Sequence, residues 1–201
     1  MSTPATQETF DARQGILETG QRIMAGKGFS AVGLNEILTA AGVPKGSFYH
    51  YFTSKDAFGE ALLESYFEDY LADLDATLRQ PGLTMAQRLM NYWRQWQETQ
   101  SFFDCQGKCL AVKLGAEVAD LSEAMRSALK RGTSEIIRRL ARAIEAGVAE
   151  GSLSIADDPD RVAQSLYQSW LGASVMVKIV RNTKPFETAM MTTFQILHLS
   201  P

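Results

Sequence analysis

Apolar residues recur at intervals of three and four positions along most of the chain, which is the spacing of helices with one buried face. No stretch shows the strict alternation of apolar and polar residues that is typical of a half-buried strand. The pattern predicts nine helices, over residues 10–25, 34–41, 44–52, 54–78, 84–100, 109–119, 122–149, 158–181 and 185–198. We therefore expect an all-α fold.

Residues 33–55 predict two short helices joined by a tight turn. The first helix has apolar residues at the i, i+3, i+4 and i+7 positions of one face: Leu34, Ile37, Leu38 and Ala41. Gly42 supplies the turn, because glycine enters the left-handed backbone conformation without steric cost. Pro44 suits the first turn of the second helix, where no N–H is needed. A helix-turn-helix of this kind places its second helix in the major groove of DNA.

The second helix carries polar side chains suited to contact DNA: Lys45, Ser47, Tyr49 and His50. Lysine and serine donate to base edges or phosphates, while tyrosine and histidine add a ring that can meet a thymine methyl. Lys55 starts the following helix, where its ammonium and the first N–H groups of that helix are expected to hold a phosphate. The alternative is that the aromatic residues only pack the small domain, and this is the interpretation we prefer for Phe48 and Phe52.

The run GVPKGSFYHYFTSK resembles the signature of the TetR (tetracycline-repressor) family of transcription regulators. The matching positions are Gly42, Val43, Gly46, Phe48, Tyr49, Tyr51, Phe52, Ser54 and Lys55. Gly33 departs from the Ser or Thr that many members have as the N-cap, but glycine is an acceptable cap. The resemblance implies a DNA-binding regulator with the nine-helix TetR-type fold. Residues 1–55 would then form the helix-turn-helix DNA-binding domain, and residues 56–201 a helical sensor and dimerisation domain.

A single DNA-binding domain makes few contacts, so we expect a homodimer on an inverted repeat in double-stranded operator DNA. In the family, the last two helices form the dimer interface. Here the two predicted helices 158–181 and 185–198 carry apolar residues that can serve a partner as well as the core: Val162, Leu166, Trp170, Ala173, Val177, Phe186, Met190, Met191, Phe194 and Leu197. The alternative is that all of these residues belong to the core of one chain.

The formal net charge of the 201 residues is −3, which is not that of a protein that binds nucleic acid over its whole surface. Residues 1–55 carry five basic and four acidic side chains, a net charge of +1, and the rest of the chain carries −4. This asymmetry has the sign expected of an N-terminal DNA-binding domain. No apolar run predicts a membrane span, and MSTPATQETF lacks the features of a signal peptide. We therefore expect a cytoplasmic protein with reduced cysteines and no membrane partner.

Both cysteines lie within residues 104–129. Cys109 falls in the first turn of a predicted helix, where the helix dipole, Lys108 and Lys113 favour the thiolate that attacks electrophiles and oxidants. Cys105 lies four residues earlier and is a candidate disulfide partner. Neither cysteine has a histidine nearby, so we expect no zinc site and no other cofactor. The general alternative is that Cys109 is a small buried hydrophobe without a role.

The segment CLAVKLGAEVADLSEAM, residues 109–125, resembles the corresponding helix of family members that sense electrophiles through a cysteine. The run WLGASVMVKI, residues 170–179, fits the same subgroup. The resemblance implies that Cys109 is the reactive residue and that the controlled genes detoxify electrophiles or reactive carbonyls. Cys105 is either a resolving thiol or a bystander. Lys178 either contacts the modified thiol or is an exposed lysine on a helix turn.

The competing hypothesis is a regulator induced by reversible binding of an apolar small molecule. Aromatic side chains that could line its pocket are Tyr92, Trp96, Phe102, Phe103, Tyr167 and Trp170. Such residues more often form plain core. An enzyme is not expected, because the chain has no phosphate-binding loop, no metal-ligand cluster and no Ser-His-Asp set, and it has only two histidines.

Overall fold

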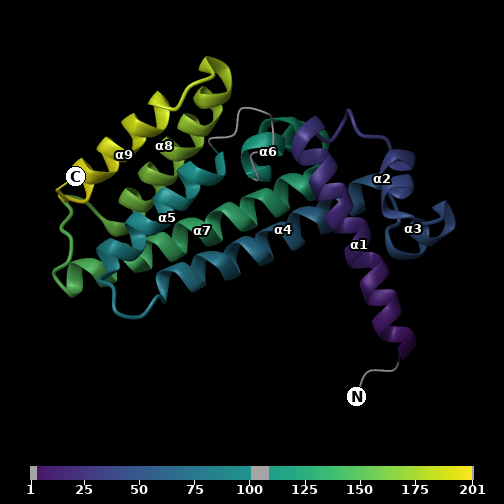
Figure 1. Ribbon diagram of the computed structural model, residues 1–201, viewed down its shortest axis with the longest axis horizontal. Helices are drawn as coiled ribbons and strands as arrows, with labels where there is room; N and C mark the ends of the chain where they lie inside the picture. The colour runs from purple at the N-terminus through teal and green to yellow at the C-terminus, as the bar shows by residue number, and fades with distance from the viewer. Residues whose placement is uncertain (1–3, 101–108, 201) are drawn as a thin grey trace. The chain divides into compact units, whose positions relative to one another are not determined.

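The computed structural model describes residues 4–100 and 109–200, and side chains from residue 12 onward. These residues form nine helices and no strand (Figure 1): α1 (Pro4–Lys27), α2 (Leu34–Ala41), α3 (Lys45–Tyr51), α4 (Lys55–Leu78), α5 (Met85–Gln100), α6 (Leu110–Leu121), α7 (Glu123–Ala149), α8 (Pro159–Val180) and α9 (Lys184–Ile196). The predicted all-α fold is confirmed. α1 begins at Pro4 rather than at residue 10, which is possible because the first turn of a helix needs no N–H from proline. Within the described ranges, no helix is long and apolar enough to cross a bilayer.

The chain divides into two compact units, Met1–Glu68 with Cys109–Lys130 and Asp69–Lys108 with Arg131–Pro201. These units do not coincide with the expected domains 1–55 and 56–201, because the first unit also takes in α6 and the adjoining parts of α4 and α7. α6 belongs there because Leu110, Leu114 and Val118 are buried and α6 packs against α1. The division of functions at residue 55 stays a prediction.

The first unit has an aromatic core that joins α3 to α4. The ring centroids of Phe48 and Phe58 lie 5.6 Å apart, and those of Phe52 and Phe58 lie 5.1 Å apart. α1 approaches α4 closely at Gly20, where a Cβ atom would lie 2.5 Å from the Phe58 ring. These ring contacts pack the inner face of α3 against α4.

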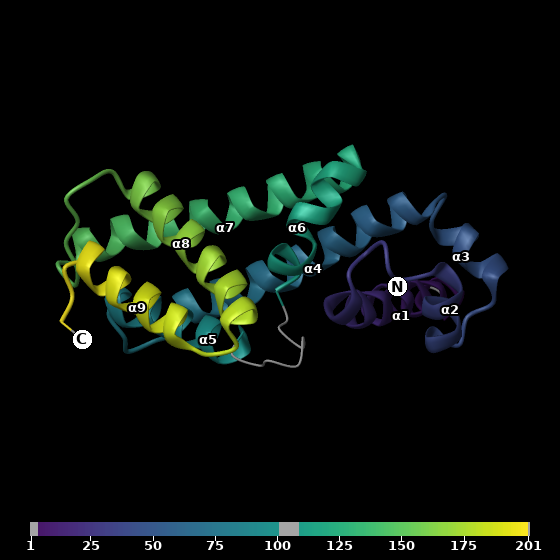
Figure 2. The same cartoon turned by 90° about the horizontal axis from the view of Figure 1, so that it is seen from above.

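The second unit has a core of three indole rings, of which Trp96 and Trp170 donate hydrogen bonds through their N–H groups. Trp93 on α5 stacks on Trp170 of α8, with 5.0 Å between ring centroids and 15° between planes. The Nε1 of Trp96 donates to Ser174 Oγ at 2.9 Å, and the Nε1 of Trp170 donates to Thr193 Oγ1 of α9 at 3.0 Å. α8 and α9 lie side by side in both Figures 1 and 2. These contacts fix α5, α8 and α9 to one another.

The apolar residues of α8 divide between two faces. The five expected to serve a partner as well as the core all lie in the core of the single chain: Val162, Leu166, Trp170, Ala173 and Val177. The exposed large apolar residues of α8 are instead Val175, Met176, Ile179 and Val180. Phe186 on α9 and Leu197 directly after this helix are buried, whereas Met191 on α9 is exposed. Any partner of α8 therefore meets residues other than the predicted ones, because the periodic apolar face is used internally.

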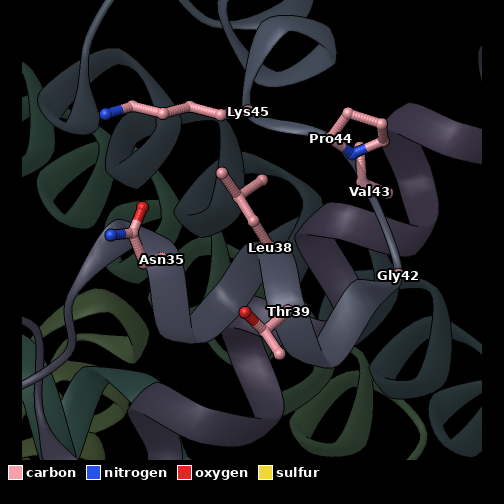
Figure 3. A pocket seen from close by; sticks show the side chains of 7 residues that line it. All are labelled: Asn35, Leu38, Thr39, Gly42, Val43, Pro44 and Lys45. Atoms are coloured by element: carbon pink, nitrogen blue, oxygen red, sulfur yellow. The ribbon is translucent and has the colours of Figure 1, made fainter.

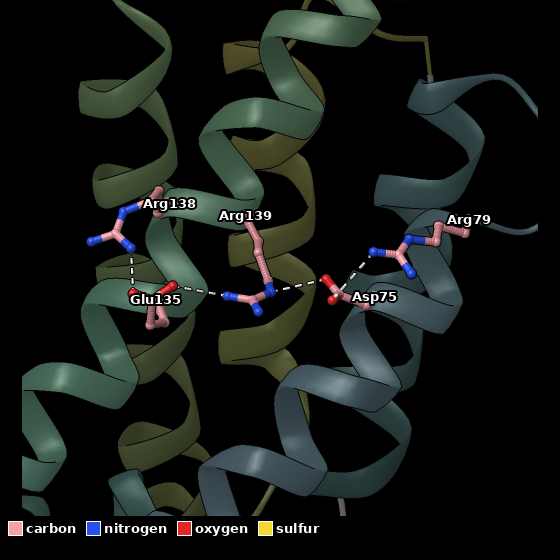
Figure 4. Close-up of polar contacts among 5 residues, drawn as sticks. All are labelled: Asp75, Arg79, Glu135, Arg138 and Arg139. Carbon is pink, nitrogen blue, oxygen red and sulfur yellow. Dashed lines mark hydrogen bonds and ion pairs between the residues drawn. The ribbon is translucent and has the colours of Figure 1, made fainter.

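A chain of ion pairs joins α4 to α7 within the second unit (Figure 4). Arg139 donates to Asp75 at 2.9 Å and to Glu135 at 3.0 Å. Arg138 also pairs with Glu135, and Arg79 lies 3.7 Å from Asp75. The side chains of Arg139 and Asp75 are only 27% and 30% exposed, so this cross-helix pair is partly shielded from water. Each of the two carboxylates thus has two arginine partners.

Candidate nucleic-acid interface and sensor site

The turn between α2 and α3 has the backbone conformation that the sequence predicts. Gly42 lies in the left-handed region at φ 66° and ψ 27°, where a residue with a Cβ is strained. The N–H of Gly42 donates to the Thr39 carbonyl at 3.2 Å, and the N–H of Val43 donates to the Leu38 carbonyl at 3.0 Å. The last carbonyl groups of α2 are thereby satisfied, and Gly42 sets the direction in which α3 follows.

The inner face of α3 is apolar. Pro44 is the N-cap of α3 rather than a residue of its first turn. Phe48 is fully buried and Phe52 nearly so, which confirms the prediction that both belong to the core.

The outer face of α3 presents polar groups to solvent. Tyr49 is 54% exposed, Lys45 and His50 are also exposed, and Ser47 is half-buried. Four of the five predicted DNA-contacting residues therefore lie on one short helix with accessible side chains. Their contacts with bases or phosphates stay predictions.

A hollow of about 490 Å³ lies between α2 and α3 (Figure 3). It is lined by Asn35, Leu38, Thr39, Gly42, Val43, Pro44 and Lys45. Figure 3 shows Lys45 and Asn35 extending to the same side of this hollow. Asn35 and Thr39 are exposed polar residues that sequence reasoning missed. The sequence indicated them only as polar residues on the face of α2 opposite its apolar residues.

Lys55 makes contacts that the sequence did not suggest. Its Nζ donates to the Phe29 carbonyl at 2.9 Å and lies 4.5 Å from the centroid of the Phe29 ring. A cation–π contact of this kind contributes about 0.5–1 kcal/mol at an exposed site. Lys55 therefore supports the segment between α1 and α2. An ammonium has three donors, so the predicted phosphate contact remains chemically open and stays a prediction.

Cys109 is the N-cap of α6, one residue before the predicted first turn. Its backbone is extended at φ −82° and ψ 100°, and its carbonyl accepts the N–H of Lys113 at 3.1 Å. The residue is only 4% exposed, so the thiol lies at the start of the helix but is shielded from solvent. Cys105 and Lys108 lie outside the described residues. Lys178 is half-buried on α8 in the second unit, and its predicted contact with the modified thiol stays a prediction.

Glu117 on α6 is a candidate residue that sequence reasoning missed. Its carboxylate accepts the N–H of Phe29 at 3.1 Å and the N–H of Ser30 at 2.7 Å. Partial burial raises the pKa of Glu117, but hydrogen bonds from Ser30 and Phe29 and the charge of Lys113 outweigh it and hold this pKa below its ordinary value. The partners are 87 and 88 residues away in sequence, so no local pattern could indicate them. Lys113 thus acts on Glu117, a function beyond its predicted effect on Cys109.

Two family models match the chain. The model of bacterial regulatory proteins of the tetR family matches residues 16–62, and that of the tetracyclin repressor-like C-terminal domain matches residues 82–193. The chain belongs to the TetR family. The helix-turn-helix described above lies inside the first match, and Cys109 and Glu117 lie inside the second.

The similarity to individual members extends over most of the chain. The HTH-type transcriptional repressor NemR of Escherichia coli strain K12 is 41% identical over 180 residues, 90% of each chain. The HTH-type transcriptional repressor DhaR of Mycobacterium sp. strain GP1 is 34% identical over 92% of this chain and 91% of its own. The crystal structure of E. coli NemR in its reduced form matches with a TM-score of 0.88 and 41% identity, over 93% of this chain and 97% of that chain. This TetR-family protein is therefore a DNA-binding transcriptional repressor and not an enzyme.

The aromatic residues predicted to line an inducer pocket are packed against one another in this repressor. The described ones are all buried: Tyr92, Trp96, Tyr167 and Trp170. The rings of Trp96 and Tyr167 meet edge to face at 5.6 Å, and the Tyr92 hydroxyl lies 2.8 Å from that of Tyr70. Phe102 and Phe103 lie outside the described residues. The described aromatics thus form a dense core, and an inducer pocket among them stays a prediction.

Proposed function

We propose that this repressor is a cytoplasmic homodimer that binds an inverted-repeat operator and releases it when an electrophile or oxidant modifies Cys109. The genes under its control are then those that detoxify electrophiles or reactive carbonyls. One observation carries the proposal: Cys109 caps α6 inside the compact unit that contains the helix-turn-helix. The similarity to NemR, whose solved structure is a reduced form, supports a thiol-dependent response.

Operator contact is assigned to the outer face of α3. Lys45 supplies a cation for a guanine edge or a phosphate, and Ser47, Tyr49 and His50 supply further hydrogen-bonding groups. The exposure of Lys45, Tyr49 and His50 supports this assignment. If Lys45 neutralises one phosphate, Lys45→Ala lowers the slope of log affinity against log salt by about 0.9.

Dimerisation is assigned to α8 and α9. The exposed residues Val175, Met176, Ile179 and Val180 follow an i, i+1, i+4, i+5 spacing and so share one face of α8. Met191 adds an exposed apolar side chain on α9, the neighbouring helix. A repressor that binds an inverted repeat is expected to be a symmetric dimer, so this exposed apolar face fits a second copy of the same chain.

The modification is an addition of the Cys109 thiol to an activated double bond, with N-ethylmaleimide as the test reagent. The Sγ atom forms a bond to one alkene carbon and the C=C π bond breaks. The other carbon takes up a proton from water, which replaces the proton that the thiol releases. Because Cys109 is 4% exposed and interiors are closely packed, the added group displaces the start of α6.

The test is a fluorescence-anisotropy titration of the reduced protein with the DNA upstream of its own gene. It is carried out with and without one equivalent of N-ethylmaleimide. We expect tight binding that the reagent abolishes. Cys109→Ser should bind equally well and ignore the reagent, whereas the matched control Cys105→Ser should still respond.

A Cys109→Ser variant that still releases DNA after treatment would show that Cys109 is not the sensor. Tight binding that the reagent leaves unchanged in the wild-type protein would exclude the cysteine mechanism as a whole and favour a reversible inducer.

One observation favours that second candidate. Trp93 Nε1 and Gln100 Oε1, both on α5, are buried without a hydrogen-bond partner in the described part of the protein. A ligand with an apolar body and a polar end would satisfy one of them. Release of DNA by such a compound should then persist in a variant that lacks both cysteines.

A further inference from the structure

The segment between α1 and α2 depends on a side chain from α6. Gly28 follows the last residue of α1 and has a φ of 90°, and the next two N–H groups, of Phe29 and Ser30, donate to the Glu117 carboxylate. A Cβ atom on Gly28 would lie 2.9 Å from Glu117 Oε2. The positive φ favours glycine here, and an added Cβ would also push the end of the Glu117 side chain aside.

The same segment is held from α4 on its other side. The Phe29 carbonyl accepts the hydrogen bond from Lys55, and the Phe29 ring lies beside Gly59, whose added Cβ would lie 2.8 Å from it. Phe29 is 5% exposed and so belongs to the core of the first unit. Only residues 30–33 separate it from α2. The place of Phe29 and Ser30 therefore fixes where α2, and with it α3, begins.

We propose that Glu117 is a positioning residue that couples α6 to the helix-turn-helix through the backbone N–H groups of Phe29 and Ser30. This inference rests on the proposed function, because it assigns the step by which displacement of α6 lowers operator affinity. The residue itself touches no DNA in this proposal. It acts by holding the segment from which α2 starts.

The distances explain why a small displacement suffices. A movement of α6 by about 1 Å away from Phe29 and Ser30 takes the hydrogen bonds of 2.7 and 3.1 Å to Glu117 outside the range of about 2.7–3.2 Å in which N–H···O bonds lie. Cys109 and Glu117 lie on either side of the buried residue Leu114 on the same helix. In this proposal, a group added to the buried thiol at the start of α6 shifts that helix and, with it, Glu117.

The test compares Glu117→Ala and Glu117→Gln with Asp120→Asn, a matched control that removes one exposed carboxylate from the same helix. Operator affinity is measured by anisotropy with the upstream DNA, before and after treatment with N-ethylmaleimide. Glu117→Ala should weaken binding by the untreated protein on the order of tenfold, as expected for two charge-assisted hydrogen bonds. Its further loss on treatment should be correspondingly smaller than in the wild-type protein. Glu117→Gln keeps one acceptor oxygen, so its operator affinity should lie between those of Glu117→Ala and the wild-type protein. Asp120→Asn should behave as wild type.

Amide hydrogen exchange gives a second, direct measurement. The N–H groups of Phe29 and Ser30 should lose protection in Glu117→Ala, lose less of it in Glu117→Gln, and keep it in Asp120→Asn. Unchanged operator affinity and unchanged protection in Glu117→Ala would overturn the inference. If N-ethylmaleimide leaves the operator affinity of the wild-type protein unchanged, the proposed cysteine switch is wrong. The operator affinity and amide exchange of the untreated variants still test whether Glu117 positions the helix-turn-helix.

Discussion

Each compact unit is held together internally by one prominent set of long-range polar contacts, and the two sets differ in kind. In the first unit, the single carboxylate of Glu117 holds two backbone N–H groups. In the second unit, Asp75 and Glu135 each have two arginine partners. Loss of one contact in the second unit leaves another in place, whereas a shift of α6 removes both hydrogen bonds of Glu117 together. The proposed response therefore depends on the first unit, where the contacts of Glu117 are lost together.

The aromatic cores differ in the same sense. The side chains of Phe48, Phe52 and Phe58 contact one another through rings that have no hydrogen-bonding group. The indoles of Trp96 and Trp170 also donate hydrogen bonds to side chains of α8 and α9. A hydrogen bond fixes the orientation of a ring, while hydrocarbon contacts restrict mainly its volume. Because of this difference, the contacts of each unit can be tested by their own variants, and we expect the largest effect from the indole core.

Trp170→Ala should have the largest effect, because it attacks the rigid core of the second unit. Trp170 is fully buried and stacks on both Trp93 and Phe186. We expect a loss of about 3–5 kcal/mol in the free energy of unfolding, measured by denaturant titration at fixed protein concentration. Trp170→Phe, which keeps a ring but loses the donor to Thr193, should lose clearly less. Equal losses in the two variants would mean that ring stacking contributes little.

Gly59→Ala should disturb the first unit where α4, α7 and the segment after α1 meet. The added Cβ would contact the Sδ of Met125 and lie 2.8 Å from the Phe29 ring. We expect a loss of about 1–3 kcal/mol, as is usual for overpacked cores. The matched control is Gly115→Ala on α6, where no atom lies within 4 Å of the added Cβ. That variant should gain up to about 1 kcal/mol from helix propensity, and a loss in it would contradict the packing described for α6.

Asp75→Asn tests the ion pairs of the second unit. The Arg139–Asp75 pair is partly shielded, so its loss should lower the free energy of unfolding by about 1 kcal/mol. Arg79→Ala is the control, because Arg79 is 80% exposed and 3.7 Å from Asp75. It should change stability by less than about 0.5 kcal/mol. A larger loss in Arg79→Ala than in Asp75→Asn would reverse the assigned importance of the two pairs.

Acid titration of Glu117 should give the smallest effect. Its pKa is lower in the folded protein than its ordinary value, so its contribution to stability is complete above about pH 4.5 and is lost as the pH falls through the folded value. The Tm difference between wild type and Glu117→Gln should therefore be constant from pH 6 to 7 and shrink below about pH 4.5. The subtraction is needed because Glu123, Glu135 and Glu150 also have lowered pKa values. A difference that grows in acid would contradict the hydrogen bonds assigned to Glu117.

Much of the fold and part of the candidate site could be predicted because the signals are local. The helices follow from apolar spacing, and the left-handed turn at Gly42 follows from the freedom of glycine. The burial of Phe48 and Phe52 and the exposure of Tyr49 follow from their places on α3. In contrast, the contact of the Lys55 ammonium with the Phe29 carbonyl could not be predicted. A phosphate oxygen and a carbonyl oxygen are both acceptors for an ammonium, and the sequence does not say which of them lies nearby.

The sequence by itself determined the all-α class, the helix-turn-helix and the family, because these depend on residues close together along the chain. Only the tertiary structure decided which apolar face of α8 is internal, that α6 belongs to the same unit as the helix-turn-helix, and that Glu117 holds Phe29 and Ser30. The physical reason is that the sequence around a carboxylate or an apolar helix face does not specify which group will contact it. Which N–H groups or side chains it meets depends on how helices far apart in sequence pack.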